Sequence, residues 1–186
     1  PYYFAAFPCG SIYLPLLLQP NQVTAVGGAY TLTGVLDVVG HTPARFFGGM
    51  TYDGWNAMIF LNPDKRYEFL YRPAADEPTV ILTDSPAPGA EGRGYRIQQG
   101  ETLYLTVEDY AQQLYNLNYA RAGRTEQFGI ASPAASTRLD EAEGLLQDAK
   151  DAYRESRYDQ WYSSSLLAWG VVRDAWNPSR TLFDDV

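Results

Sequence analysis

The sequence predicts an α+β fold: an antiparallel β-sandwich followed by a helix and a C-terminal antiparallel α-hairpin. Short runs of branched and aromatic residues, separated by turn residues, fill positions 23–105, whereas apolar residues at helical spacing dominate positions 106–186. Strands followed by helices are typical of segregated layers rather than of alternating βαβ units. We therefore expect an extended apolar lead-in over 1–22, a β-sandwich domain over 23–105 and a helical segment over 106–186.

The lead-in is apolar and contains several prolines, which exclude a helix because proline lacks a backbone N–H. We expect residues 11–19 to form an edge strand or a strap packed on the domain, where Pro15 is tolerated. The alternative is a strand donated to a neighbouring molecule. In that case the assembly residues are Ile12, Tyr13, Leu14, Leu16, Leu17 and Leu18.

Eight short runs in the second region predict strands, because each is rich in branched or aromatic residues and bounded by turn residues. They are Val23–Val26, Tyr30–Val39, Arg45–Met50, Ala57–Leu61, Tyr67–Tyr71, Thr79–Thr83, Gly94–Ile97 and Thr102–Leu105. Between the fourth and fifth runs, Asn62-Pro-Asp-Lys65 predicts a tight turn, since proline and aspartate both favour turn geometry.

Three helices are predicted in the last region. The first begins after an N-cap at Thr106 and ends between Gly123 and Pro133. The second begins near Ser136 and ends before a break at residues 155–159. The third carries Trp169 and Trp176 on one face, with Trp161 on another flank, and is expected to stop at Asn177-Pro178. So short a break between the last two helices indicates antiparallel packing.

Composition excludes several classes of partner and cofactor. The net charge of -8 disfavours contact with nucleic-acid backbones. One cysteine, Cys9, and one histidine, His41, are too few for a disulfide or for a metal site built from those residue types, so we expect no metal and no cofactor. The apolar run at 12–18 is too short to span a bilayer. We expect no membrane contact except through a lipid on Cys9.

No enzymatic motif is present, and we expect no catalytic residues. The sequence contains no phosphate loop, nucleophile elbow or metalloprotease helix motif. His41 stands in the turn-like segment Gly40-His-Thr-Pro43 and is expected to be a surface residue. The acidic residues of the β region are spread over several turns and strands, and nothing marks two of them as a catalytic pair.

The segment Tyr52-Asp-Gly-Trp-Asn56 is the best candidate for a ligand site. Sugar rings stack on aromatic side chains, and nearby polar groups fix their orientation. This turn combines Tyr52 and Trp55 with Asp53 and Asn56, which gives the predicted ligand-binding residues. The alternative is that Trp55 closes one end of the hydrophobic core.

A longer stretch resembles a known type of accessory region. It comprises Leu82-Thr-Asp84, Gly94-Tyr-Arg-Ile-Gln-Gln-Gly-Glu-Thr-Leu103, Tyr110-Ala-Gln-Gln-Leu-Tyr115, Leu139-Asp-Glu-Ala-Glu-Gly-Leu-Leu146 and Ala149-Lys-Asp-Ala-Tyr153. About half of the chain resembles the N-terminal accessory region, a β-sandwich plus helical hairpin, that precedes the catalytic barrel in secreted glycoside hydrolase family 10-like proteins. The resemblance implies no catalytic residues here, because that family's paired glutamates lie on barrel strands.

Two functions are therefore expected, both for a secreted bacterial protein located outside the cell or at its surface. The first is a non-catalytic accessory or binding module for a glycan or a partner protein, acting through the aromatic turn. The alternative is a structural surface protein, such as a filament, envelope or membrane-complex subunit, that self-associates through residues 12–18. The packing of residues 12–18 distinguishes the two: packing on their own domain favours the first, and packing on another chain favours the second.

Overall fold

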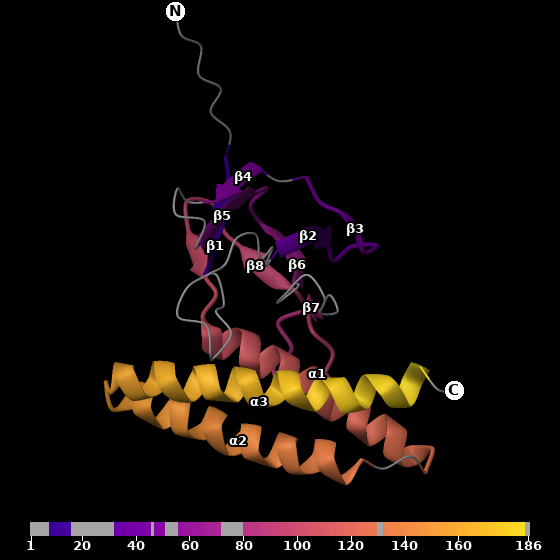
Figure 1. Cartoon of the computed structure of the whole chain (residues 1–186). Coiled ribbons are helices and arrows are strands. Elements are labelled where there is room, and N and C mark those ends of the chain that lie inside the picture. The colour runs from indigo at the N-terminus through magenta and orange to yellow at the C-terminus, as the bar shows by residue number, and fades with distance from the viewer. Residues whose placement is uncertain are drawn as a thin grey trace, which may run out of the picture. The chain divides into compact units, whose positions relative to one another are not determined.

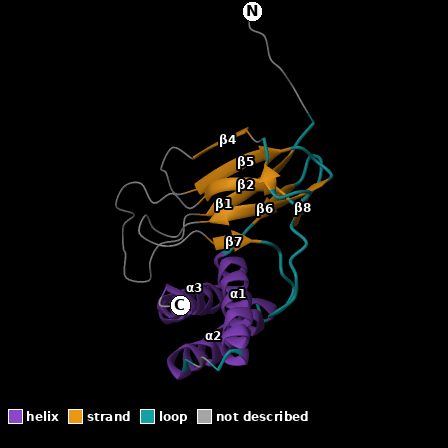
Figure 2. Ribbon diagram, turned by 90° about the vertical axis from the view of Figure 1, so that its right-hand side faces the viewer, coloured by secondary structure: helices purple, strands orange, loops and turns teal. Residues whose placement is uncertain are grey.

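The computed structural model describes residues 8–15, 32–45, 47–50, 56–71, 80–129 and 132–184. The chain divides into two compact units. Unit 1 contains the nine described strands, arranged in two sheets, and unit 2 contains the three described helices (Figures 1 and 2). The predicted α+β class is therefore confirmed.

The first sheet of unit 1 has four strands in the order β4 (Phe47–Met50), β5 (Asn56–Leu61), β1 (Gly10–Pro15) and β9 (Thr102–Tyr104). Strand β1 pairs with β5 in antiparallel register along its whole length and with β9 in parallel register over Ser11–Tyr13. The prediction of an edge strand is wrong for these residues, because β1 has a neighbour on each side. Pro15 is tolerated because it is the last residue of β1 and lies beyond the pairing with β9.

The second sheet contains five strands with β6 at its centre. The path runs β3 (Thr42–Pro43), β2 (Leu32–Asp37), β6 (Lys65–Tyr71) and β7 (Val80–Leu82), and β8 (Tyr95–Ile97) also pairs with β6. Seven of the eight predicted strands are confirmed to within two residues at each end. The eighth, at 23–26, lies outside the described residues. Strand β3 was not predicted, because a two-residue strand that contains proline has little sequence signal.

The core of unit 1 takes apolar side chains from both sheets. Ile12 and Ile59 come from the first sheet, and Val35 and Phe69 from the second; all four are at most 3% exposed. Gly94 holds β8 close to β6. Its φ is +72°, and a Cβ at this position would collide with the Cγ2 of Val38, so only glycine fits without strain.

Helix α1 (Val107–Gln127) of unit 2 begins as the sequence predicted. Thr106 is its N-cap: the Thr106 Oγ1 accepts a hydrogen bond from the Asp109 N–H, and the Asp109 carboxylate accepts one from the Thr106 N–H. This reciprocal capping box satisfies two N–H groups that the helix itself leaves unpaired. Gly123 lies inside the helix, which ends just before Gly129, where φ is +75°. A single glycine lowers helix stability by about 1 kcal/mol and does not by itself end a helix.

Helices α2 (Pro133–Arg154) and α3 (Tyr158–Asp184) follow. The α2 start was predicted about three residues too late, because Ser132 is the N-cap and Pro133 occupies the first turn, where a missing N–H does no harm. The predicted stop at Asn177-Pro178 is wrong, since α3 continues to Asp184. An interior proline removes one backbone hydrogen bond and bends a helix, and it does not always end it.

The core of unit 2 lies among the three helices. Ala142 and Ala149 of α2 are fully buried. Trp169 and Val172 of α3 are at most 2% exposed. The buried residues of α2 include several alanines, and small side chains allow neighbouring helices to pack closely. The prediction that Trp169 is a core residue is thus confirmed. Within the described residues, no helix combines the length and the apolar character needed to cross a bilayer.

Candidate ligand-binding surface

The aromatic turn predicted from the sequence falls almost entirely outside the described part of the chain. Tyr52, Asp53 and Trp55 are not described, and Asn56 is the first residue of β5. Its backbone is opposite Pro15 in the register of the first sheet. The predicted ligand-binding role of this turn therefore stays a prediction.

The predicted assembly residues fall partly within β1. Ile12 is 0% exposed and packs inside unit 1. Tyr13 is half-buried, and its ring lies 5.6 Å from that of Tyr104. Leu14 belongs to the same strand, whereas residues 16–18 lie outside the described residues. The side chain of Ile12 is thus occupied by contacts within its own unit.

Cys9 carries a free thiol and is half-buried. Its carbonyl oxygen accepts a hydrogen bond from the Gly100 N–H at 2.9 Å, which ties the start of β1 to the turn before β9. In the described ranges, no group of His, Cys, Asp and Glu side chains is arranged to hold a metal ion.

His41 has a specific partner that the sequence did not reveal. Its Nδ1 lies 2.9 Å from Oε2 of Glu68, whose side chain is only 6% exposed, while the His41 side chain is 69% exposed. Glu68 is the middle residue of β6, between the core residues Tyr67 and Phe69, and so points to the opposite face of the sheet. A surface histidine therefore partners a buried carboxylate 27 positions away in the sequence.

The Asp37 carboxylate also has a basic partner. Its Oδ2 accepts a hydrogen bond from the Lys65 Nζ at 2.8 Å, and its Oδ1 accepts one from the Val39 N–H. The bond from Lys65 is the main cause that lowers the pKa of Asp37 below its usual value. In this sheet, both described carboxylates, Asp37 and Glu68, therefore have a basic side chain as hydrogen-bond partner.

Aromatic side chains gather at the connection between α2 and α3. The Tyr153 ring lies 5.9 Å from that of Tyr158 and 5.7 Å from that of Trp161. Tyr153 and Tyr158 are 56% and 57% exposed, and Trp161 is half-buried. The Trp161 indole N–H donates a 2.6 Å hydrogen bond to the Glu108 carboxylate, which fixes one ring of the cluster. As predicted, Trp161 has surroundings different from those of the buried Trp169.

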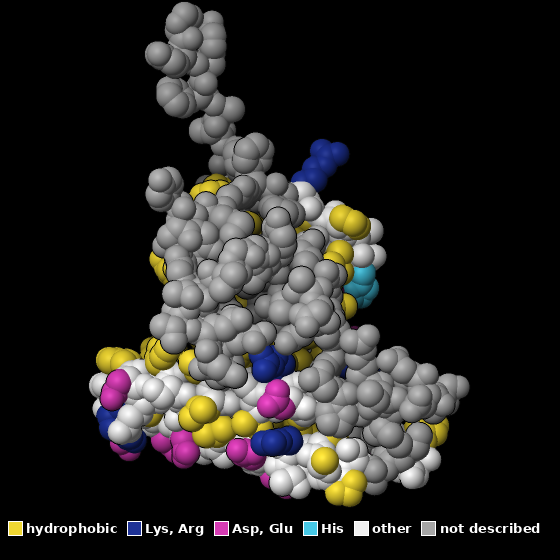
Figure 3. Space-filling model, viewed as in Figure 1, with side chains coloured by type: hydrophobic (Ala, Val, Ile, Leu, Met, Phe, Trp, Pro, Cys, Tyr) yellow, Lys and Arg dark blue, Asp and Glu magenta, His cyan; other side chains and the backbone are white. Residues whose placement is uncertain are grey.

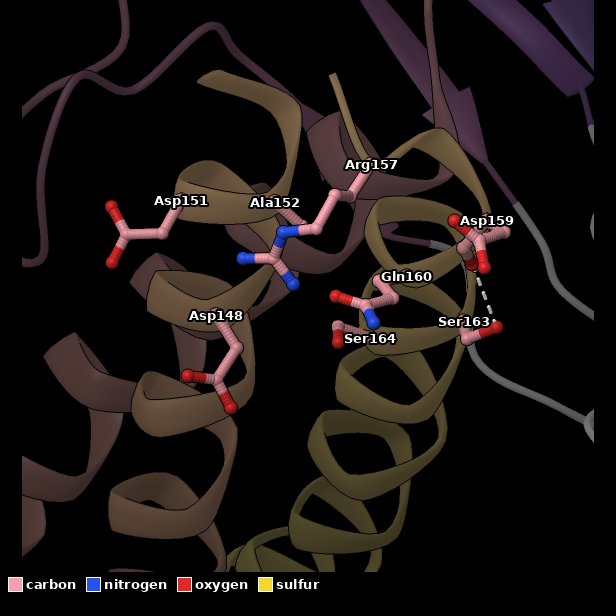
Figure 4. Close-up of a pocket in the computed structure, with 8 residues that line it drawn as sticks. All are labelled: Asp148, Asp151, Ala152, Arg157, Asp159, Gln160, Ser163 and Ser164. Atoms are coloured by element: carbon pink, nitrogen blue, oxygen red, sulfur yellow. Dashed lines mark hydrogen bonds between the residues drawn. The ribbon is translucent and has the colours of Figure 1, made fainter. Parts of the chain in front are cut away.

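A polar pocket of about 330 Å³ opens at the same connection (Figure 4). Asp148 and Asp151 of α2 line one side, and Asp159, Gln160 and Ser164 of α3 line the other. The guanidinium of Arg157, from the short connection, points into the space between them. The volume is at the lower end of the range of about 300–1,000 Å³ that is typical of small-molecule sites.

Charges around this pocket are only partly balanced. Arg157 is paired with Glu155, at 2.6 Å, and Asp151 with Arg154, at 2.7 Å. Within the described structure, neither Asp148 nor Asp159 forms an ion pair. The pocket therefore offers two carboxylates, an amide and a hydroxyl for hydrogen bonds to a ligand. Figure 3 shows acidic side chains on the surface of the helical unit.

Sequence reasoning missed both features of this connection. The sequence gives no signal that brings the acidic residues of α2 and α3 together, and the only signal for the cluster is the concentration of aromatic residues from Tyr153 to Tyr162. Comparison of the chain with protein-family models, with curated proteins and with solved structures found no match.

Proposed function

We propose that this chain is a non-catalytic binding module, located outside the cell or at its surface, that binds a glycan. The observation that carries the proposal is the aromatic cluster of Tyr153, Tyr158 and Trp161, whose two tyrosines are exposed, beside a polar pocket. Aromatic faces stack on the C–H faces of sugar rings, and carboxylates, amides and guanidinium groups bind their hydroxyls. A ligand-binding role does not require the acid–base pair of an enzyme.

The resemblance to accessory regions of secreted glycoside hydrolase family 10-like proteins supports the same proposal. So does the proposed architecture, in which the two sheets of unit 1 form a β-sandwich and α2 and α3 form an antiparallel hairpin. Apolar side chains buried from both sheets support the sandwich, and the three-residue connection from Glu155 to Arg157 supports the hairpin. The turn at 52–56 is proposed as a second contact for the glycan.

The alternative is a structural surface protein that self-associates through residues 12–18. The burial of Ile12 within unit 1 supports the binding module over this alternative. Light scattering on the purified chain separates the two proposals. A particle near 20.8 kDa agrees with a binding module, and a large or open-ended assembly agrees with the structural protein.

The glycan proposal is tested by isothermal titration calorimetry with hexasaccharides of glucose, xylose and N-acetylglucosamine. We expect at least one of them to bind. Replacing both exposed rings, in Tyr153→Ala/Tyr158→Ala, should weaken that binding roughly tenfold, since each aromatic contact contributes about 0.5–1.5 kcal/mol. Tyr119→Ala is the matched control, because Tyr119 is 50% exposed on α1 and is outside the cluster. Trp55→Ala tests the 52–56 turn separately.

Three results would count against the proposal. They are no binding of any hexasaccharide, equal weakening by the control, and unchanged affinity in the Tyr153→Ala/Tyr158→Ala variant. Unchanged affinity in Trp55→Ala alone would remove the turn from the site and leave the helical cluster in place.

A further inference from the structure

We propose that the outer face of the first sheet in unit 1 is a binding surface of its own for an uncharged glycan. This face lies opposite the one that carries the paired, buried side chains of Ile12 and Ile59. The inference rests on the proposed glycan binding and adds to it a site on the other unit and the charge of the ligand.

Sheet register places six described side chains on this face. Residues directly opposite each other on neighbouring strands point to the same face, and successive residues of one strand point to opposite faces. Two rows therefore cross β5, β1 and β9 on the outer face: Met58, Tyr13 and Tyr104 form one, and Phe60, Ser11 and Thr102 form the other.

None of these six side chains is charged, although the face is in part exposed. Tyr104 is 62% exposed and Phe60 is 37% exposed. An antiparallel sheet that turns one face to water usually has polar residues there. The second sheet follows this pattern, because its outer face carries the charged residues Arg66, Glu68 and Arg96, which alternate with buried ones. Aromatic side chains with a few uncharged polar groups are instead typical of ligand sites.

The chemistry of the outer face matches that of an uncharged sugar. The rings of Tyr13 and Tyr104 are adjacent, with centroids 5.6 Å apart and planes inclined at 49°. Aromatic rings stack on the C–H faces of sugars, and the hydroxyls of tyrosine and threonine can donate to and accept from sugar hydroxyls. The Ser11 hydroxyl lies 2.7 Å from that of Thr102 and holds it in place. A charged ligand would lose hydration on this face without gaining a counter-charge.

The size of the face favours a small ligand over a second copy of the chain. Strands lie about 4.8 Å apart and residues on one face repeat about every 6.7 Å, so two rows on three strands cover on the order of 200 Å². A stable protein–protein interface takes about 800 Å² from each partner. The described face is therefore large enough for a few sugar rings and too small for a stable dimer.

The test follows the backbone amide signals of the chain by NMR during titration with the glucose hexasaccharide, which is uncharged. We expect the signals of β1 and β9 to shift, with an affinity that changes by no more than about twofold between low and high salt. Tyr104→Ala should weaken this binding roughly threefold to tenfold, whereas Tyr104→Phe keeps the ring and should retain most of it. Tyr119→Ala is the matched control, because Tyr119 is 50% exposed on α1.

Signals of β1 and β9 that do not shift, unchanged affinity in Tyr104→Ala, or equal weakening in Tyr119→Ala would overturn the inference. If the hexasaccharide shifts only signals of the helical cluster, this inference fails and the proposed function stands. Shifts confined to the first sheet would support this inference and remove the helical cluster from glycan binding. If no signal shifts with any hexasaccharide, both proposals fail. A dimer in light scattering that becomes a monomer in Tyr104→Ala would assign the face to a second copy and would also overturn the inference.

Discussion

Removing the imidazole of His41 should destabilise unit 1, because it leaves the buried carboxylate of Glu68 without its hydrogen-bond partner. The bond is 2.9 Å long, and the Glu68 side chain is 6% exposed, so little water can replace the donor. A hydrogen bond to a charged group contributes about 1.5–3 kcal/mol, and breaking a fully buried ion pair costs about 3–5 kcal/mol. His41 is 69% exposed, which places the expected loss in the lower range, about 1.5–3 kcal/mol.

A double-mutant cycle, measured by urea denaturation, isolates this interaction. The variants are His41→Ala, Glu68→Leu and the two combined. Leucine suits the position because Glu68 is directly opposite Leu36 on β2. In the Glu68→Leu background, His41→Ala should change the free energy of unfolding by no more than about 0.5 kcal/mol, as at an ordinary surface position. Any backbone strain at His41, where φ is +49°, is present in both arms of the cycle and cancels.

A loss below about 0.5 kcal/mol for His41→Ala in the wild-type background would refute the reasoning. It would mean that the Glu68 carboxylate is hydrated, or that another group takes the place of the imidazole. An equally large loss in the Glu68→Leu background would also refute it, since His41 would then stabilise the turn without help from the carboxylate.

Three further predictions concern other parts of the chain. Thr106→Ala removes one half of the capping box with Asp109 and should lower the free energy of unfolding by about 1 kcal/mol; unchanged urea denaturation would contradict this. Gly94→Ala should destabilise by at least about 1–3 kcal/mol in the same assay, because its Cβ would collide with Val38 at a positive φ, whereas Gly89→Ala, also at a positive φ but in open space, should lose less. Burial and the nearby charge of Glu143 raise the pKa of Tyr115 to about 12, from an unfolded value near 10, so the folded chain holds this proton more tightly. Stability should therefore fall as pH rises from 10 to 12, and Tyr115→Phe should reduce that fall; an identical pH profile for the variant would contradict the prediction.

The strands and helices were largely predictable because their signals are local. Hydrophobic runs between turn residues located seven strands, and the N-cap at Thr106 located the start of α1. These signals depend only on a few neighbouring residues, so they can be recognised in the sequence without knowledge of the tertiary contacts. The largest error among the helix boundaries was at Pro178, where the local signal predicts a stop and α3 continues.

Pairings between distant residues could be known only from the tertiary structure. The sequence by itself determined that residues 10–15 are extended, whereas the pairing with β5 and β9 decided that they form an interior strand. In the same way the sequence shows an exposed turn histidine, a run of aromatic residues and an acidic helix. Only the folded chain brings His41 to Glu68, and Asp148 to the same pocket as Asp159. The physical reason is that such contacts depend on sheet register and helix packing, which are set by the burial of the whole core. They leave no periodic pattern in the sequence around either of the two residues in contact.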